Sequence, residues 1–339
     1  GRILKESQGF TAAEVDYAKG GTLRAARYID ERIVKIETDF VKEYLTHKNP
    51  YTGMTYIDDP VVAVVQYTNE SSVTWFNTYN ENNVFHSMFQ TRFNAWLADK
   101  YKTRSALKKA WTNADGDCAL ASDEDPSKGT VRCSEIGGWG ESTVRWSTDY
   151  GSVQSAPRYA DFMSFLYDVQ SNVFLNVYQM LRNLGYKSAI NMSNIPRGAV
   201  EVKLNSLGDV MEENAYWNLA GPQLPANCGT NPMSSVDVST SDTIISNFAR
   251  ASVTDKPFIA TEWNSSIASD FRADAVFQVA AYGSLQDWDG FCLFTYTFEG
   301  DEVNFDFTTN FDSFLNSNID PAMWGQFGMA AAIFRLGLV

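Results

Sequence analysis

Residues 61–70 read VVAVVQYTNE, an apolar, β-branched run that continues into a polar tail ending at Glu70. A short run of this kind is typical of a strand with both faces buried, which we predict over Val61–Val65. Comparable strand segments recur near residues 188, 209, 257 and 290. Segments with helical spacing of apolar residues lie between most of them, so the pattern indicates a parallel α/β sheet.

Helical periodicity is clearest in six other parts of the chain, namely residues 24–47, 82–112, 159–184, 240–252, 270–285 and 321–336. Residues 113–157 are instead polar and rich in glycine, and we expect a long inserted loop without regular structure there. Cys118 and Cys133 bracket part of this loop, and a disulfide between them would suit a secreted protein. Two unrelated free thiols are the alternative.

The order of the predicted elements favours a closed (β/α)8 TIM barrel. No glycine-rich phosphate-binding motif follows any predicted strand, which argues against dinucleotide-binding and P-loop folds. Five strands do not close an eight-stranded barrel, and the first 60 residues offer no convincing strand. We therefore expect residues 1–339 to be a single catalytic barrel domain that holds strands 4 to 8, with the first three βα units preceding residue 1.

Composition excludes several classes of function. The chain has 27 basic and 41 acidic residues and a net charge of −14, the opposite of what a protein that binds nucleic-acid backbones needs. The sequence contains no apolar run of about 18 residues, the length that a membrane-spanning helix needs. Only His47 and His86 are histidines, and no CxxC pair occurs, so a metal site or a Ser-His-Asp triad is poorly supplied. We expect no metal and no cofactor, and we look to carboxylates for acid/base chemistry.

Two glutamates stand where a barrel enzyme carries its chemistry, because catalytic residues of TIM barrels lie at the carboxyl ends of strands. Glu70 follows the Val61–Val65 strand, and Glu262 ends the Lys256–Glu262 strand segment. Glycoside hydrolysis needs two carboxyl groups, one that donates a proton to the leaving oxygen and one that stays ionised. The two glutamates lie far apart in the chain, so only the fold can bring them together.

Further motifs extend this pattern over nearly the whole chain. They are Asn49-Pro50-Tyr51-Thr52-Gly53, residues 58–63, Thr68-Asn69-Glu70, Ala95-Trp96-Leu97 with Tyr101, residues 181–185, Gly325-Gln326-Phe327 and residues 334–337. Together with an Asn-Glu pair at one strand end and a lone glutamate at a later one, they resemble the clan A glycoside hydrolases. The closest resemblance is to the cellulase-like, family-5-type members, which are retaining β-glycosidases.

The resemblance implies a role for each matching residue. Glu70 takes the role of general acid/base, and Glu262 that of nucleophile. Asn69 would form a hydrogen bond with the 2-hydroxyl of the sugar, a contact that strengthens in the transition state. Such enzymes often place an aromatic platform after the eighth strand, for which Tyr296 is the candidate.

One motif departs from the family pattern. Where family members carry a His-x-Tyr pair, this chain has Asn214-Ala215-Tyr216. Tyr216 matches the tyrosine that touches the nucleophile, whereas Asn214 replaces the histidine. Trp263 directly follows the proposed nucleophile, and Trp75 and Trp217 also follow predicted strand ends, so we consider all three for the lining of a sugar cleft.

The sequence thus predicts a secreted, retaining glycoside hydrolase that acts on a β-linked oligo- or polysaccharide of glucan, mannan or galactan type. Double displacement further predicts carboxyl groups about 5–5.5 Å apart. The alternative is a carbohydrate-binding barrel that has lost catalysis. A barrel lyase or aldolase is a weaker alternative, because no predicted strand end offers a Schiff-base lysine or a metal ligand set.

Overall fold

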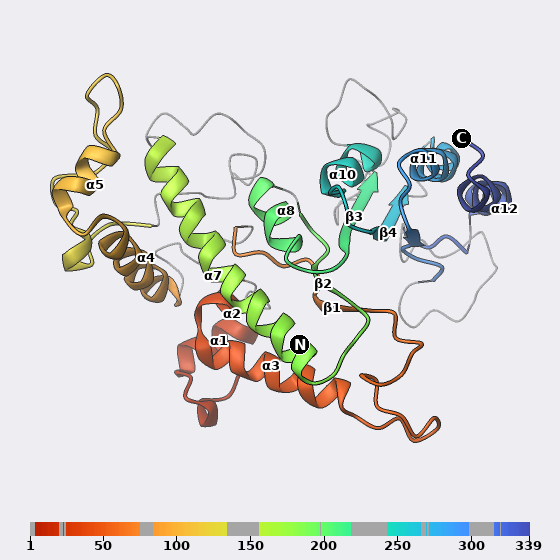
Figure 1. The fold of residues 1–339 in the computed structure, drawn as a ribbon, viewed down its shortest axis with the longest axis horizontal. Helices are drawn as coiled ribbons and strands as arrows, with labels where there is room; N and C mark the ends of the chain where they lie inside the picture. Colours follow the sequence, from red (N-terminus) through yellow and green to blue (C-terminus); the bar gives the residue numbers. More distant parts are fainter. Residues whose placement is uncertain are drawn as a thin grey trace. The chain divides into compact units, whose positions relative to one another are not determined.

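The computed structural model describes residues 4–19, 23, 25–74, 84–133, 156–196, 198–217, 243–265, 269, 271–297, 315–318 and 320–339. The chain divides into two compact units, Gly1–Gly208 and Asp209–Val339. Both units combine helices with parallel strands, so the predicted α/β class is confirmed (Figure 1). The closed barrel and the single domain over residues 1–339 stay predictions. No helix in the described part of the chain is both long and apolar enough to cross a membrane.

The first unit holds two parallel strands, β1 (Val64–Thr68) and β2 (Ala189–Ser193), paired from Val64 with Ala189 to Thr68 with Ser193. Its helices are α1 (Ala12–Lys19), α2 (Ala26–Ile29), α3 (Glu31–Leu45), α4 (His86–Tyr101), α5 (Arg104–Ala110), α7 (Ala156–Asn183) and α8 (Ala199–Asn205). The long α7 packs against α2, α3, α4 and α8 (Figure 1). Helices α1 and α8 were not predicted from the sequence.

Local hydrogen bonds explain two boundaries that differ from prediction. The helix expected over residues 24–47 is interrupted at Asp30, whose side chain caps α3 by accepting from the backbone N–H of Arg32. The strand expected over Val61–Val65 instead begins at Val64 and runs to Thr68. Asp59 causes this shift, because its side chain and its carbonyl accept from the next backbone N–H groups and hold a turn.

The predicted disulfide between Cys118 and Cys133 is wrong, because neither cysteine forms a disulfide in the structure. The thiol of Cys118 instead donates to the carbonyl of Lys108 at 3.5 Å. Within the predicted long loop, residues 113–133 contain one short 3-10 helix, η2 (Pro126–Lys128). Residues 134–155 lie outside the described part of the chain, and α7 already begins at Ala156.

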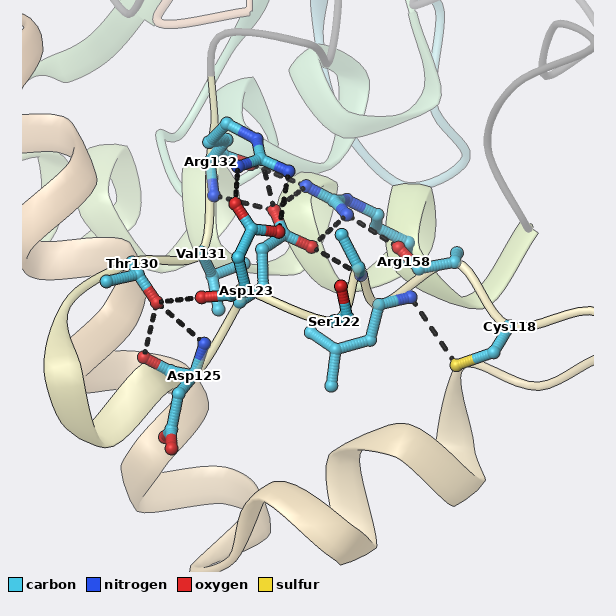
Figure 2. Close-up of polar contacts among 12 residues, drawn as sticks. Cys118, Ser122, Asp123, Asp125, Thr130, Val131, Arg132 and Arg158 are labelled. Atoms are coloured by element: carbon cyan, nitrogen blue, oxygen red, sulfur yellow. Dashed lines mark hydrogen bonds and ion pairs between the residues drawn. The ribbon is translucent and has the colours of Figure 1, made fainter.

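A buried ion pair ties this segment down where a disulfide was expected (Figure 2). Glu124 is fully buried and accepts two hydrogen bonds from the guanidinium of Arg158, at 2.8 and 2.9 Å. The same carboxylate accepts from the backbone N–H groups of Ala121 and Arg132, each at 3.0 Å. Burial alone would raise the pKa of Glu124, but these hydrogen bonds outweigh it and hold the pKa below its usual value.

The second unit is a three-stranded parallel sheet with helices packed on it. Strands β3 (Met211–Trp217), β4 (Phe258–Ser265) and β5 (Gly290–Leu293) lie side by side in chain order. Its helices are α10 (Ile244–Ala251), α11 (Arg272–Leu285) and α12 (Pro321–Leu336). Gly283 lets α11 approach β5 closely, because a Cβ atom there would lie 2.4 Å from the ring of Phe291.

We predict that Glu124→Gln lowers the free energy of unfolding by about 3 kcal/mol, because it leaves the guanidinium of Arg158 buried without its anionic partner. Urea unfolding at pH 7 measures the effect. Asp123→Asn is the control: Asp123 pairs with Arg132 at the surface, and its loss should change little. Because the pKa of Glu124 is lowered on folding, the difference between wild type and variant should shrink as the pH falls below about 4.5. Equal unfolding curves for wild type and Glu124→Gln at pH 7 would contradict the prediction.

Candidate active site

Glu70 lies two residues beyond the end of β1, in an uncommon backbone conformation. Its φ is +39°, in the left-handed region that residues other than glycine seldom adopt. Such strain persists only where surrounding contacts hold it, and it gathers at functional sites. The contact that holds it here comes from the neighbouring strand: the backbone N–H of Glu70 donates to Oδ1 of Asn194 at 2.8 Å. Asn194 directly follows β2 and is 1% exposed.

Asn69 is exposed beside Glu70 and is fixed from two sides. Its Oδ1 atom accepts from Nδ2 of Asn194 at 2.7 Å and from Nε2 of Gln66 at 3.4 Å. Asn194 therefore contacts both residues of the Asn-Glu pair. It was missed from the sequence because an asparagine after a predicted strand carries no signal of its own.

A second, largely buried hydrogen-bond network connects the end of β1 to residues of and beside α2. Arg27 donates to Glu37 at 2.9 Å and to the hydroxyl of Thr68 at 3.0 Å. The hydroxyl of Tyr28 donates to the carbonyl of Ser71 at 3.1 Å. These contacts hold the chain on both sides of Glu70, so its backbone is constrained before and after the carboxyl-bearing residue.

Glu262 lies in the carboxyl-terminal half of β4, opposite Asn214 of β3. The hydroxyl of Tyr216 donates a short hydrogen bond to Glu262, as the resemblance implied. The side chain of Asn214 is fully buried and accepts from the hydroxyl of Thr261 at 2.9 Å. The β3–β4 register shifts by one residue next to Asn214, so β4 holds Thr261 as an extra residue and Glu262 pairs with Asn214, two residues before Tyr216.

Trp263 lies on the other face of the sheet, because successive side chains of a strand point to opposite faces. It is 2% exposed and stacks on Phe327 of α12, with ring centroids 6.3 Å apart. Its surroundings are those of a core residue, and the same holds for Trp217, which is 5% exposed. Trp75 lies outside the described residues.

Tyr296 has the exposure that a sugar platform needs. It is 46% exposed, and its ring packs edge-on against Trp324 at 5.6 Å. Trp324 in turn packs against Phe327 at 4.6 Å. The tyrosine is therefore backed by aromatic side chains of α12 while much of its own surface stays open to solvent.

Glu212 is a buried carboxyl that the sequence analysis did not single out. It lies on β3 on the same face as Asn214 and Tyr216, because residues two apart share a face. It is 2% exposed, and its Oε2 atom has no hydrogen-bond partner among the described residues. Burial raises the pKa of Glu212 to about 8, so the group is mainly protonated at neutral pH.

The structure places the predicted residues in two groups. Asn69 and Glu70 lie in the first unit, and Glu262 lies with Asn214 and Tyr216 in the second. The predicted gap of about 5–5.5 Å between the two carboxyl groups stays a prediction. Among the described residues, no cluster of three or more His, Cys, Asp or Glu side chains is placed to hold a metal ion.

No family model and no curated protein matches the sequence. Among solved structures, the fold is similar to that of an exo-β-agarase, with a TM-score of 0.54, 13% identity, and coverage of 92% of this chain and 39% of that one. It is also similar to PfGH50B, with a TM-score of 0.53, 12% identity, and coverage of 92% and 43%. This chain thus spans less than half the length of either structure, and at such identity the likeness shows the fold alone.

We predict that Glu212→Gln stabilises the protein at pH 8 and changes little at pH 4.5. The folded protein keeps this carboxyl protonated up to about pH 8, whereas the unfolded chain ionises it near 4.5. Stability is therefore lost as the pH rises through this window, on the order of a few kcal/mol, and glutamine removes the loss. Urea unfolding of both proteins at the two pH values measures it. A stability difference that does not depend on pH would show that Glu212 is ionised in the folded protein.

Proposed function

We propose that this chain is the catalytic part of a retaining glycoside hydrolase, with Glu70 as general acid/base and Glu262 as nucleophile. The observation that carries the proposal is a pair of glutamates near the carboxyl ends of parallel strands, each fixed by a hydrogen bond from or to a neighbouring strand segment. The fold around them is like that of an exo-β-agarase. The motifs shared with clan A enzymes of family-5 type support the same assignment of roles.

The proposed fold is a (β/α)8 barrel in which β1 to β5 serve as strands 4 to 8. The parallel pairing of β1 with β2, and of β3 with β4 and β5, has the order that this barrel requires. In such a barrel all five carboxyl ends face the same rim. Glu70 and Glu262 would each belong to that rim.

The proposed reaction has two steps. In the first, the carboxylate of Glu262 attacks the anomeric carbon, while Glu70 gives its proton to the departing glycosidic oxygen. In the second, Glu70 takes a proton from water, the water oxygen attacks the same carbon, and the bond to Glu262 breaks. Two inversions at one carbon give net retention, and the protein needs no cofactor for either step.

We propose a β-linked galactan as the first substrate to test within the predicted glucan, mannan and galactan classes. The support is the fold likeness to an exo-β-agarase. The exposed ring of Tyr296 suits stacking on the C–H face of a sugar, and Asn69 offers polar contact beside Glu70. Because a polysaccharide substrate is too large to enter a cell intact, we also propose that the protein is secreted.

We predict that purified wild-type protein releases reducing sugar from agarose or from another polymer in a panel of β-glucans, mannans, xylans and galactans. Glu262→Gln should abolish release, and Glu70→Gln should lower it about 10²–10⁴-fold. Binding of the polymer, measured by affinity electrophoresis, should survive in both variants. Binding without release by the folded wild type would favour the inactive carbohydrate-binding barrel.

Stereochemistry tests the mechanism apart from the substrate. Proton NMR of the first product formed should show the β-anomer, as double displacement requires. Azide should rescue Glu262→Ala with an α-linked glycosyl azide, and Glu70→Ala with a β-linked one. An α-anomer as first product would replace the double displacement with a single inverting step.

We predict that Tyr216→Phe lowers kcat about 10–100-fold. The lost hydrogen bond reaches a charged carboxylate, for which such bonds contribute about 1.5–3 kcal/mol. Steady-state kinetics on the polymer that the wild type cleaves measures the change in kcat. Tyr282→Phe is the control, since Tyr282 is an exposed tyrosine on α11. An unchanged kcat in Tyr216→Phe would remove Tyr216 from the proposed site.

A further inference from the structure

The hydrogen bonds around Asn194 settle which way three side-chain amides point. A backbone N–H can only donate, so the atom of Asn194 that faces the N–H of Glu70 at 2.8 Å must be its oxygen. The nitrogen of Asn194 therefore faces Asn69, at 2.7 Å. Because an amide nitrogen can only donate, the atom of Asn69 that accepts this hydrogen bond must be its oxygen.

Gln66 fixes the same orientation independently. Its Nε2 atom faces the backbone carbonyl of Thr68 at 3.2 Å, and a carbonyl can only accept. That nitrogen also reaches the oxygen of Asn69 at 3.4 Å, while the oxygen of Gln66 accepts from Nδ2 of Asn194 at 3.3 Å. Two backbone groups, one donor and one acceptor, thus fix the ring of three amides from both ends.

This ring leaves one group free to face a ligand. The oxygen of Asn69 accepts two hydrogen bonds, while no described residue accepts from its Nδ2 atom. Asn69 is exposed, whereas Asn194 is 1% exposed and fully committed to Glu70, Asn69 and Gln66. The end of β1 therefore presents an N–H₂ group and no amide oxygen next to Glu70.

We propose that Asn194 is a positioning residue that makes Asn69 a dedicated hydrogen-bond donor and holds Glu70 in its left-handed backbone conformation. The ligand atom that Asn69 meets must then be an oxygen with a free lone pair, such as a sugar hydroxyl acting as acceptor. This identification of the ligand atom rests on the proposed glycosidase function. The orientation of the three amides does not, so the two are tested separately.

The orientation is tested on the full chain labelled with ¹⁵N-asparagine. The side-chain NH₂ signals are assigned by their loss in Asn69→Asp and Asn194→Asp. We expect the Asn194 amide protons to exchange with solvent at least about 100-fold more slowly than those of Asn69, because only the former are buried and bonded. Rapid exchange at Asn194, or equal protection at both residues, would overturn the amide ring whether or not the protein cleaves sugars.

The effect on the ligand is tested with Asn194→Asp, which still accepts from the Glu70 N–H and cannot donate to Asn69. The substituted carboxylate would turn the Asn69 amide round, so that its oxygen faces the ligand. We expect kcat/KM on a 4-nitrophenyl β-glycoside of the sugar that the wild type cleaves to fall about 10–100-fold. Ser193→Ala is the matched control, because Ser193 precedes Asn194 and its hydroxyl donates to the carbonyl of Ser71 at 3.2 Å, with no bond to the three amides.

Substrates that each lack one hydroxyl separate positioning from a general structural defect. On the deoxy substrate that lacks the hydroxyl bound by Asn69, Asn194→Asp should change kcat/KM little. On the other deoxy substrates it should lower kcat/KM by the full factor of about 10–100. An equal loss on every deoxy substrate, or an equal loss in Ser193→Ala, would overturn the role in ligand binding. If the exchange result holds but no glycoside is cleaved, the amide ring stands and the proposed glycosidase function fails.

Discussion

The parallel pairing of β3 with β4 determines which side chains of the second unit can act together. Because paired residues share a face, the match of Asn214 with Glu262 brings Tyr216 within hydrogen-bonding reach of the carboxylate. The same match sends Trp263 to the opposite face, against α12. A slip of one residue would exchange the two faces, burying the carboxylate among apolar helices, so the β4 irregularity at Thr261 belongs to the site as much as the glutamate does.

Buried polar groups joined in hydrogen-bond networks hold the segments of the first unit that carry the candidate site. Asn194 satisfies the strained end of β1, Arg27 and Glu37 support it from below, and Glu124 with Arg158 anchors the segment before α7. Each network supplies a hydrogen-bond partner or a counter-charge to a buried group, and burying such a group without a partner costs free energy of folding. Buried hydrogen-bond networks specify one arrangement, and a carboxyl group proposed for catalysis needs that definition more than it needs added stability.

Much of the fold was predictable from the sequence, because apolar periodicity carries its signal locally. The segments of all five strands and of the helices α4, α7, α11 and α12 follow from spacing alone. The strand start at Val64 does not, since it depends on a turn built by the side chain of Asp59. The pairing of Cys118 with Cys133 failed for a related reason: closeness in sequence says nothing of the charge on Arg158, which reaches the segment from another helix.

The site divides along the same line. The contact of Tyr216 with Glu262 was predictable because a strand-end carboxylate and its phenol partner follow a recognisable motif, whereas the catalytic roles of Glu70 and Glu262 stay predictions. Asn194 and Glu212 were not predictable, since their meaning lies in burial and in partners far away in the chain. The contrast between Glu212 and Glu124 makes the point physically. Both carboxyl groups are buried, yet one keeps its proton and the other its charge, because only Glu124 meets a guanidinium and two backbone N–H groups.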